Sequence, residues 1–169
     1  SLIKEAKKLS SMYTLADILK ANCGTLDIRG VAHKGFFASI TDFPSYYDAN
    51  MNLLDYKAAQ ELFHDNWPIY TRTNDSCPTQ YFDTAEVKNS VISNGCQIEG
   101  TVENSVIGRG CVIKKGAVVK NSVVLAEVTV GEGVHVENEV VDKWARLVHE
   151  KEIVSPADQP GYIRRGDTL

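Results

Sequence analysis

Residues 87–92 read Val-Lys-Asn-Ser-Val-Ile, and the same six-residue pattern returns three times further along the chain. The later copies occupy residues 102–107, 119–124 and 136–141. Their asparagines are separated by 15, 17 and 17 residues, and shorter units such as Gly110-Cys-Val-Ile113 lie between them. Near-identical units of roughly six residues, repeated in this way, are typical of the hexapeptide β-helix.

In such a fold each unit supplies one short strand and one turn, and one aliphatic side chain per strand points inward. A single coil cannot cover these side chains, whereas stacked coils bury them in a continuous column. We therefore predict a mainly β fold with a β-helix of the left-handed form, an exception to the usual crossover hand. The residues expected to line its core are Ile92, Ile98, Ile107, Ile113, Val124, Val130 and Val136. A flat meander or sandwich is the alternative, but it would need alternating strands with turn signals about every 8–12 residues.

The first part of the chain has a mixed α/β pattern and no repeat. Helical periodicity is present near residues 2–9, and Thr14-Leu-Ala-Asp17 resembles a capping box that begins a second helix. Short apolar runs predict strands at 26–31 and 35–40. These elements are too few for a complete doubly wound sheet. We interpret them as the tail end of an α/β domain whose beginning is missing.

Further helices are expected between this region and the repeats. Asp42 followed by Pro44 fits a helix start, and we predict helices over 45–54 and 57–63. Turn and breaker residues then mark a connector, within which residues 69–71 could add one strand. The predicted organisation is an α/β remnant at 1–64, a linker at 65–85, and the β-helix with a C-terminal tail at 86–169.

Composition excludes several classes of protein. The 169 residues are 43% hydrophobic and 24% charged, as expected for a folded chain, and the net charge is −4. A pI near 5.6 argues against a nucleic-acid partner. No apolar run is long enough to cross a membrane and no signal peptide is visible, so a cytoplasmic location is expected. The four cysteines show no disulfide or zinc spacing, which favours reduced thiols.

Two of the cysteines, Cys96 and Cys111, hold the same place in successive repeats. They could form a redox or metal pair, but a tight corner also favours a small residue, and we interpret them as packing residues. Gly108-Arg-Gly110 and Gly131-Glu-Gly133 lack the third glycine and the helix of a dinucleotide loop, so they are interpreted as turns.

Charged and titratable side chains offer only weak candidates for a site. His135 lies between two valines and should point away from the core, although a hexapeptide acyltransferase would use a histidine as general base. Two basic pairs, Lys114 with Lys115 and Arg164 with Arg165, are candidates for binding a phosphorylated effector. Ordinary solvated surface charge is the alternative for both pairs.

The stretch Gly35–Leu54 resembles sugar-nucleotide pyrophosphorylases, and more closely the glucose-1-phosphate adenylyltransferase family of bacterial glycogen synthesis. The most specific matches are Tyr47-Asp-Ala-Asn-Met-Asn-Leu-Leu54 and the linker segment Trp67-Pro-Ile-Tyr-Thr71. The resemblance implies a Rossmann-like nucleotidyltransferase domain followed by a linker and a left-handed β-helix. It also implies that the parent complex makes ADP-glucose and pyrophosphate from ATP and glucose-1-phosphate with Mg²⁺.

Two departures from the family pattern affect the expected function. The family's N-terminal Gly-rich nucleotide loop is absent, so the chain is expected to be a C-terminal portion of a longer protein. Catalytic members also carry Asp-Val-Gly-Thr after the equivalent of Gly35-Phe36-Phe37, and that Asp helps to hold the metal ion. Aligned without gaps, its place is taken by Ser39, and a hydroxyl cannot replace a carboxylate at Mg²⁺. The chain is therefore expected to contain no catalytic residue, metal ligand or cofactor of its own.

The Ser-Ile-Thr variant at 39–41 resembles the D-type (GlgD) subunit, which implies a regulatory chain beside a catalytic-type subunit, or one that associates with itself. A hexapeptide acyltransferase and a non-catalytic oligomerisation module are the alternatives.

Overall fold

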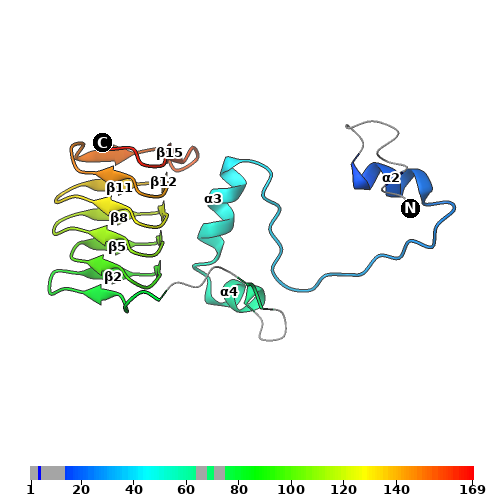
Figure 1. Cartoon of the computed structure of the whole chain (residues 1–169), viewed down its shortest axis with the longest axis horizontal. Helices are drawn as coiled ribbons and strands as arrows, with labels where there is room; N and C mark the ends of the chain where they lie inside the picture. Colours follow the sequence, from blue (N-terminus) through cyan, green and yellow to red (C-terminus); the bar gives the residue numbers. More distant parts are fainter. Residues whose placement is uncertain (1–3, 5–13, 64–67, 71–74) are drawn as a thin grey trace. The chain divides into compact units, whose positions relative to one another are not determined.

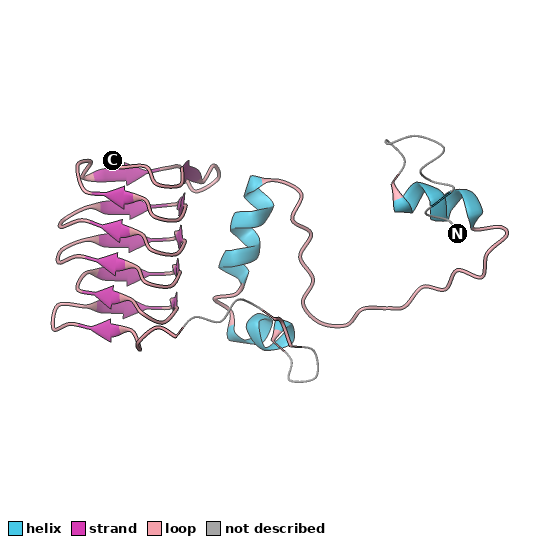
Figure 2. Cartoon of the chain, viewed as in Figure 1, coloured by secondary structure: helices cyan, strands magenta, loops and turns pink. Residues whose placement is uncertain are grey.

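The computed structural model describes residue 4 and residues 14–63, 68–70 and 75–169. The chain forms two compact units, with the boundary between Lys34 and Gly35. In these described ranges the helices lie before residue 63 and the strands after residue 79 (Figures 1 and 2). No helix in the described ranges has the length and apolar character needed to cross a membrane.

The first unit contains one described helix, α2, Leu15–Asn22. Thr14 Oγ1 accepts a hydrogen bond from the Asp17 amide at 3.3 Å, while the Asp17 carboxylate accepts from the Thr14 amide at 3.0 Å. This reciprocal cap confirms the predicted capping box. The helix predicted near residues 2–9 lies outside the described residues, apart from Lys4. The strand predicted at 26–31 is wrong, since these residues form no strand.

The second unit begins with an extended segment and two helices. The strand predicted at 35–40 does not form. A further strand was predicted at 69–71. Residues 69 and 70 have no regular structure, and residue 71 lies outside the described part of the chain. Isolated strands are unstable without a partner to pair with, and the described residues offer these segments none.

Helix α3 spans Phe43–Asn52 and α4 spans Tyr56–Leu62, close to the predicted ranges. Asp42 caps α3, because its Oδ1 accepts a hydrogen bond from the Ser45 amide at 2.9 Å. Pro44 stands in the first turn, where its missing N–H costs nothing.

The rest of the unit is a β-helix of five coils whose strands build three parallel sheets. The first sheet contains β1 (Gln80–Tyr81), β4 (Gln97–Ile98), β7 (Val112–Ile113), β10 (Thr129–Val130) and β13 (Arg146–Leu147). The second contains β2 (Glu86–Lys88), β5 (Thr101–Glu103), β8 (Val118–Lys120), β11 (His135–Glu137) and β14 (Glu152–Val154). The third contains β3 (Val91–Ile92), β6 (Val106–Ile107), β9 (Val123–Val124), β12 (Glu139–Val141) and β15 (Gly161–Ile163). The mainly β solenoid expected from the hexapeptide repeats is confirmed.

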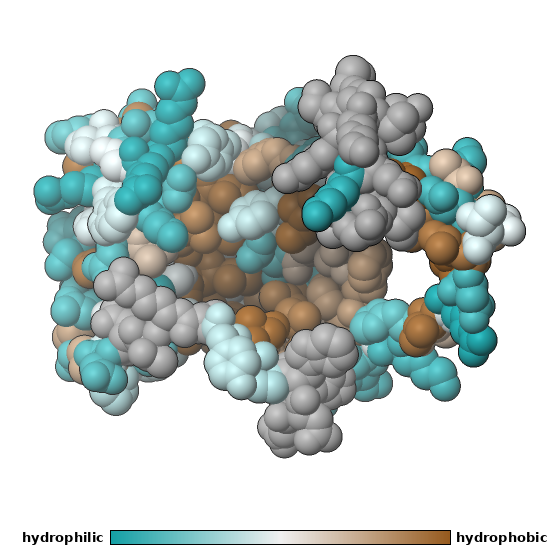
Figure 3. Space-filling view, turned by 45° about the vertical axis from the view of Figure 1, so that its right-hand side comes forward, coloured by the Kyte–Doolittle hydropathy of each residue, from teal (hydrophilic) through white to brown (hydrophobic). Residues whose placement is uncertain are grey.

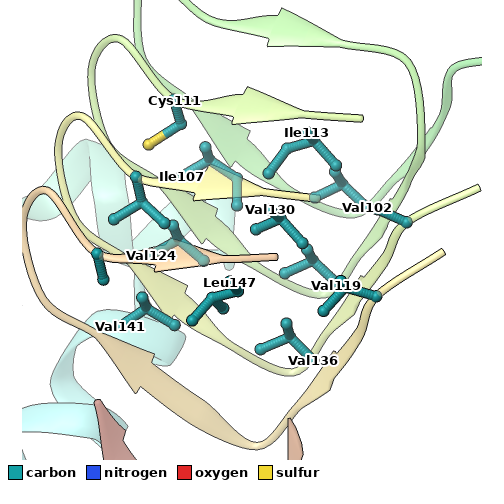
Figure 4. Close-up of a cluster of buried hydrophobic side chains, with 14 of the residues drawn as sticks. Val102, Ile107, Cys111, Ile113, Val119, Val124, Val130, Val136, Val141 and Leu147 are labelled. Atoms are coloured by element: carbon teal, nitrogen blue, oxygen red, sulfur yellow. The ribbon is translucent and has the colours of Figure 1, made fainter. Parts of the chain in front are cut away.

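The inward side chains form one continuous core along the axis of the coils (Figure 4). Six of the residues expected to line it have 0% exposure: Ile98, Ile107, Ile113, Val124, Val130 and Val136. Ile92 is only partly buried, because it lies on the first coil and has a neighbouring coil on one side only. For the same reason Val87 stays 41% exposed although its register partner Val102 is fully buried.

The repeated Asn-Ser pair makes the corner between the second and third sheets. Four asparagines adopt left-handed backbone conformations, with φ of 44° at Asn89, 45° at Asn104, 45° at Asn121 and 57° at Asn138. Asn tolerates this region better than most residues, which explains its place in the motif. The serines stack: Ser105 Oγ accepts from the Ser122 amide at 3.1 Å and donates to the Glu103 carbonyl at 2.7 Å. This ladder satisfies buried polar groups at each corner.

The core assignment predicts the effect of a buried charge. Ile107→Asp should unfold the β-helix, because a lone carboxylate in an apolar core costs several kcal/mol. Thermal unfolding followed by circular dichroism would measure this, with Val112→Asp as control, since that side chain points outward from the neighbouring coil and is partly exposed. Equal melting temperatures for Ile107→Asp and the unaltered chain would contradict the assignment.

Candidate functional site

Helix α3 lies across the outer face of the third sheet. Tyr47 is 9% exposed and packs with Val123 and Val140, which are 0% and 1% exposed. These two valines face outward from their strands, so their burial depends on the helix. The surrounding apolar side chains are partly buried: Phe43, Tyr46, Met51, Val106 and Leu125. The view of Figure 3 shows apolar residues gathered on one part of the surface, with hydrophilic residues beside them.

Two specific contacts fix α3 in place on this sheet. The Tyr47 hydroxyl donates a hydrogen bond of 2.5 Å to the Asn121 carbonyl. Burial raises the pKa of Tyr47, and the nearby Asp48 and Glu137 add to the increase. At the start of the helix, the rings of Phe43 and Tyr162 meet edge to face with centroids 5.8 Å apart. The helix is therefore tied to the third, fourth and fifth coils together.

The segment before α3 carries Ser39, the residue that the sequence resemblance predicts to stand in place of the family's metal-binding aspartate. Ser39 is exposed, and the only carboxylate in the run 39–42 belongs to Asp42. That carboxylate already caps α3, and its hydrogen bonds from Ser45 hold the pKa of Asp42 below its usual value. Within the described ranges, no cluster of three or more His, Cys, Asp or Glu side chains could hold a metal ion. The segment 39–42 thus offers a single carboxylate, already used in the cap, which does not fit the oxygen-ligand set that Mg²⁺ needs.

The two basic pairs lie at different corners of the β-helix. Lys114 and Lys115 follow β7, at the corner between the first and second sheets, whereas Arg164 and Arg165 follow β15, at the corner between the third and first. The structure therefore does not bring the pairs together.

Each pair also has local partners. Lys114 Nζ lies 3.8 Å from Glu99, and Lys115 lines an open pocket of about 360 Å³ that Asp83 and Glu99 also line. The Arg165 guanidinium lies over the Trp144 ring, 3.9 Å from its centroid, a cation–π contact. The carboxylates beside the lysines weaken the attraction of that corner for an anion.

The histidine and the cysteines have neighbours that explain their positions. His135 lies on the outer face of β11 with Nε2 3.2 Å from Glu137. The Cys96 and Cys111 thiols are buried and donate to the carbonyls of Gly108 at 3.1 Å and Leu125 at 3.0 Å. The neighbouring Cys96 side chain and burial in this corner raise the pKa of Cys111 and keep it a thiol.

Sequence reasoning missed a buried carboxyl at Glu139. It stands where earlier copies of the motif have serine, and its residue is only 4% exposed. Ser155 Oγ donates to Glu139 Oε1 at 2.5 Å, and the carboxyl fills the space beside Gly161, where a Cβ would come within 2.2 Å of Oε2. Burial raises the pKa of Glu139. The only signal in the sequence was the change from Ser to Glu within the fourth copy.

This carboxyl predicts a pH dependence of stability. Because the pKa of Glu139 is higher in the folded chain, folding favours the protonated form. Its contribution is complete below the unfolded value near 4.5 and is lost as pH rises through the folded value. Glu139→Gln should flatten this part of the stability–pH curve and make the variant relatively more stable at neutral pH. Chemical unfolding between about pH 4 and 8 would measure it, and parallel curves for the two proteins would contradict it.

The chain is similar to glucose-1-phosphate adenylyltransferases and to glycogen biosynthesis proteins named GlgD. Residues 78–159 match the family model described as GlmU-like, C-terminal hexapeptide. The chain is 34% identical over 141 residues to a glucose-1-phosphate adenylyltransferase of Fervidobacterium nodosum, an alignment covering 83% of this chain and 34% of the relative. It is 31% identical over 153 residues to the glycogen biosynthesis protein GlgD of Bacillus subtilis, covering 90% of this chain and 45% of the relative. The chain thus spans less than half the length of these relatives.

Proposed function

We propose that this chain is the C-terminal part of a D-type subunit, which does not itself catalyse nucleotidyl transfer. The chain belongs to the family of glucose-1-phosphate adenylyltransferases and GlgD proteins. The proposal is carried by Ser39, an exposed serine at the position where the resemblance predicts a metal-binding carboxylate. Asp42, three residues later, is committed to capping α3 and does not compensate. The alignment with GlgD extends over 90% of the chain and is compatible with this assignment, as is the alignment with the adenylyltransferase over 83% with membership of the wider family.

The N-terminal part of the chain supports the view that a larger domain is completed elsewhere. Phe37 is 77% exposed and Ile40 is 58% exposed, although both belong to a run with strand character. Val31, in the preceding predicted strand, is 93% exposed. Apolar residues of this kind are buried once their strands pair within a sheet. The remaining strands would come from the portion of the parent protein that precedes this chain.

The parent complex, in this proposal, makes ADP-glucose and pyrophosphate from ATP and glucose-1-phosphate. ATP and Mg²⁺ would be held by a catalytic-type subunit of the same family, and the β-helix would provide contacts between subunits or between copies of this chain. A phosphorylated metabolite would act on the assembly as effector, with Arg164 and Arg165 or Lys114 and Lys115 as candidate contacts.

Activity of the longer parent protein tests this proposal. Alone, it should make no ADP-glucose, and mixed with a catalytic-type subunit it should change that subunit's rate or its response to phosphorylated effectors. Restoring the carboxylate by Ser39→Asp should raise the activity of the parent alone if this position is the main defect, whereas Ala38→Asp, which adds the same charge next to it, should not.

Robust synthesis by the unaltered parent alone would contradict the assignment to a non-catalytic subunit. Oligomerisation with no effect on the catalytic subunit would instead favour a purely structural module. Acyl transfer that depends on His135 would favour the hexapeptide acyltransferase.

A further inference from the structure

Tyr162, on β15, connects the last coil of the β-helix with the first turn of α3. Its ring meets Phe43 edge to face, with an interplanar angle of 71°. Its hydroxyl donates a hydrogen bond of 2.9 Å to Asp142 Oδ2, in the turn that follows β12. The side chain is therefore held on one side by the helix and on the other by the neighbouring coil.

The contact of Phe43 with Tyr162 positions the whole first turn of α3, because hydrogen bonds hold this turn rigid. The Asp42 carboxylate accepts from the Ser45 amide at 2.9 Å, and the Ser45 hydroxyl accepts from the Asp42 amide at 3.1 Å. The Tyr46 amide adds the first helical bond, to the Asp42 carbonyl at 3.2 Å. Ser39 lies three residues before this cap. Where the turn is fixed, the segment that carries Ser39 is fixed at its C-terminal end.

The other anchor of α3 lies one turn further along. Tyr47 reaches Asn121 on the third coil, whereas Phe43 reaches Tyr162 on the fifth. Two anchors on different coils define the direction of the helix. The anchor at Phe43 depends on Tyr162, which is 53% exposed. A ligand or partner that binds to the surface around Tyr162 would therefore alter its contact with Phe43.

Charged residues surround the hydroxyl of Tyr162. The hydrogen bond to Asp142 raises the pKa of Tyr162, Asp167 adds to the increase, and Arg164 opposes it. Arg165, the next residue, is stacked over Trp144. The corner that bears the Arg164–Arg165 pair is thus in electrostatic contact with the residue that meets α3.

We propose that Tyr162 is a positioning residue, through which the last coil of the β-helix fixes the start of α3 and with it the segment that carries Ser39. The proposal rests on the proposed function only for the meaning of position 39, since the contact itself belongs to the chain alone. It gives the β-helix a physical means of acting on the α/β part of a subunit.

Hydrogen exchange of the Tyr46 amide in the 169-residue chain, followed by NMR, tests this proposal. Tyr162→Ala removes the ring pair, and exchange at Tyr46 should become about fivefold faster. Tyr162→Phe keeps the ring and should restore exchange to within about twofold of the unaltered chain. Tyr81→Ala is the matched control, because Tyr81 is also a strand residue and is 54% exposed, but lies on the first coil.

A change confined to α3 in Tyr162→Ala, recovered in Tyr162→Phe and absent in Tyr81→Ala, supports the positioning role. Unchanged exchange at Tyr46 in Tyr162→Ala overturns it. Equal acceleration of α3 and of the strands in the second and third coils also overturns it, because the residue would then only stabilise the whole fold. The measurement needs no enzymatic activity, so its failure is distinguishable from failure of the proposed function.

Discussion

The β-helix depends on contacts between coils, because no single coil can bury its own inward side chains. Each strand is two or three residues long and gains stability only from the strand above and the strand below it. The consequence is visible at the first coil, where Val87 and Ile92 occupy inward positions yet remain partly exposed. In the middle coils the equivalent residues, Val102 and Ile107, are fully buried. In such a solenoid the terminal coils, which have a neighbouring coil on one side only, are therefore stabilised less than the interior coils.

The same constraint decides how much could be predicted from the sequence. The repeat revealed the coils because stacking requires like residues at like positions, and Asn and Ser return wherever the corner needs a left-handed turn and a buried hydroxyl. The repeat does not mark the fifth coil, because β14 and β15 lack the motif and Gly161 pairs with Glu139 across a spacing of 22 residues instead of 17. The strands predicted at 26–31 and 35–40 failed for a different reason. Local strand preference cannot form a sheet without partner strands.

The candidate site was predictable only in part. A resemblance over Gly35–Leu54 pointed to position 39, and the pattern of Asp42 before Pro44 predicted the start of α3, which the hydrogen bond from the Ser45 amide to the Asp42 carboxylate confirms. The sequence also gave no sign that Tyr47 would bond Asn121 or that Phe43 would meet Tyr162, because these contacts join residues more than 70 positions apart. Together they turn an amphipathic helix into a fixed link between the β-helix and the segment before it. The proposed non-catalytic role would need such a link between the β-helix and the rest of the subunit.

Amide exchange of this chain, alone and within the longer parent protein, tests most directly whether it is the C-terminal part of a larger subunit. The strands of the middle coils, such as β8 and β9, should be protected in both samples, because their partners lie within the chain. Residues 26–31 and 35–40 should be protected only in the parent, where the missing strands can pair with them. Strong protection of these two segments in the isolated chain would contradict the account, since it would mean that the chain completes its own fold.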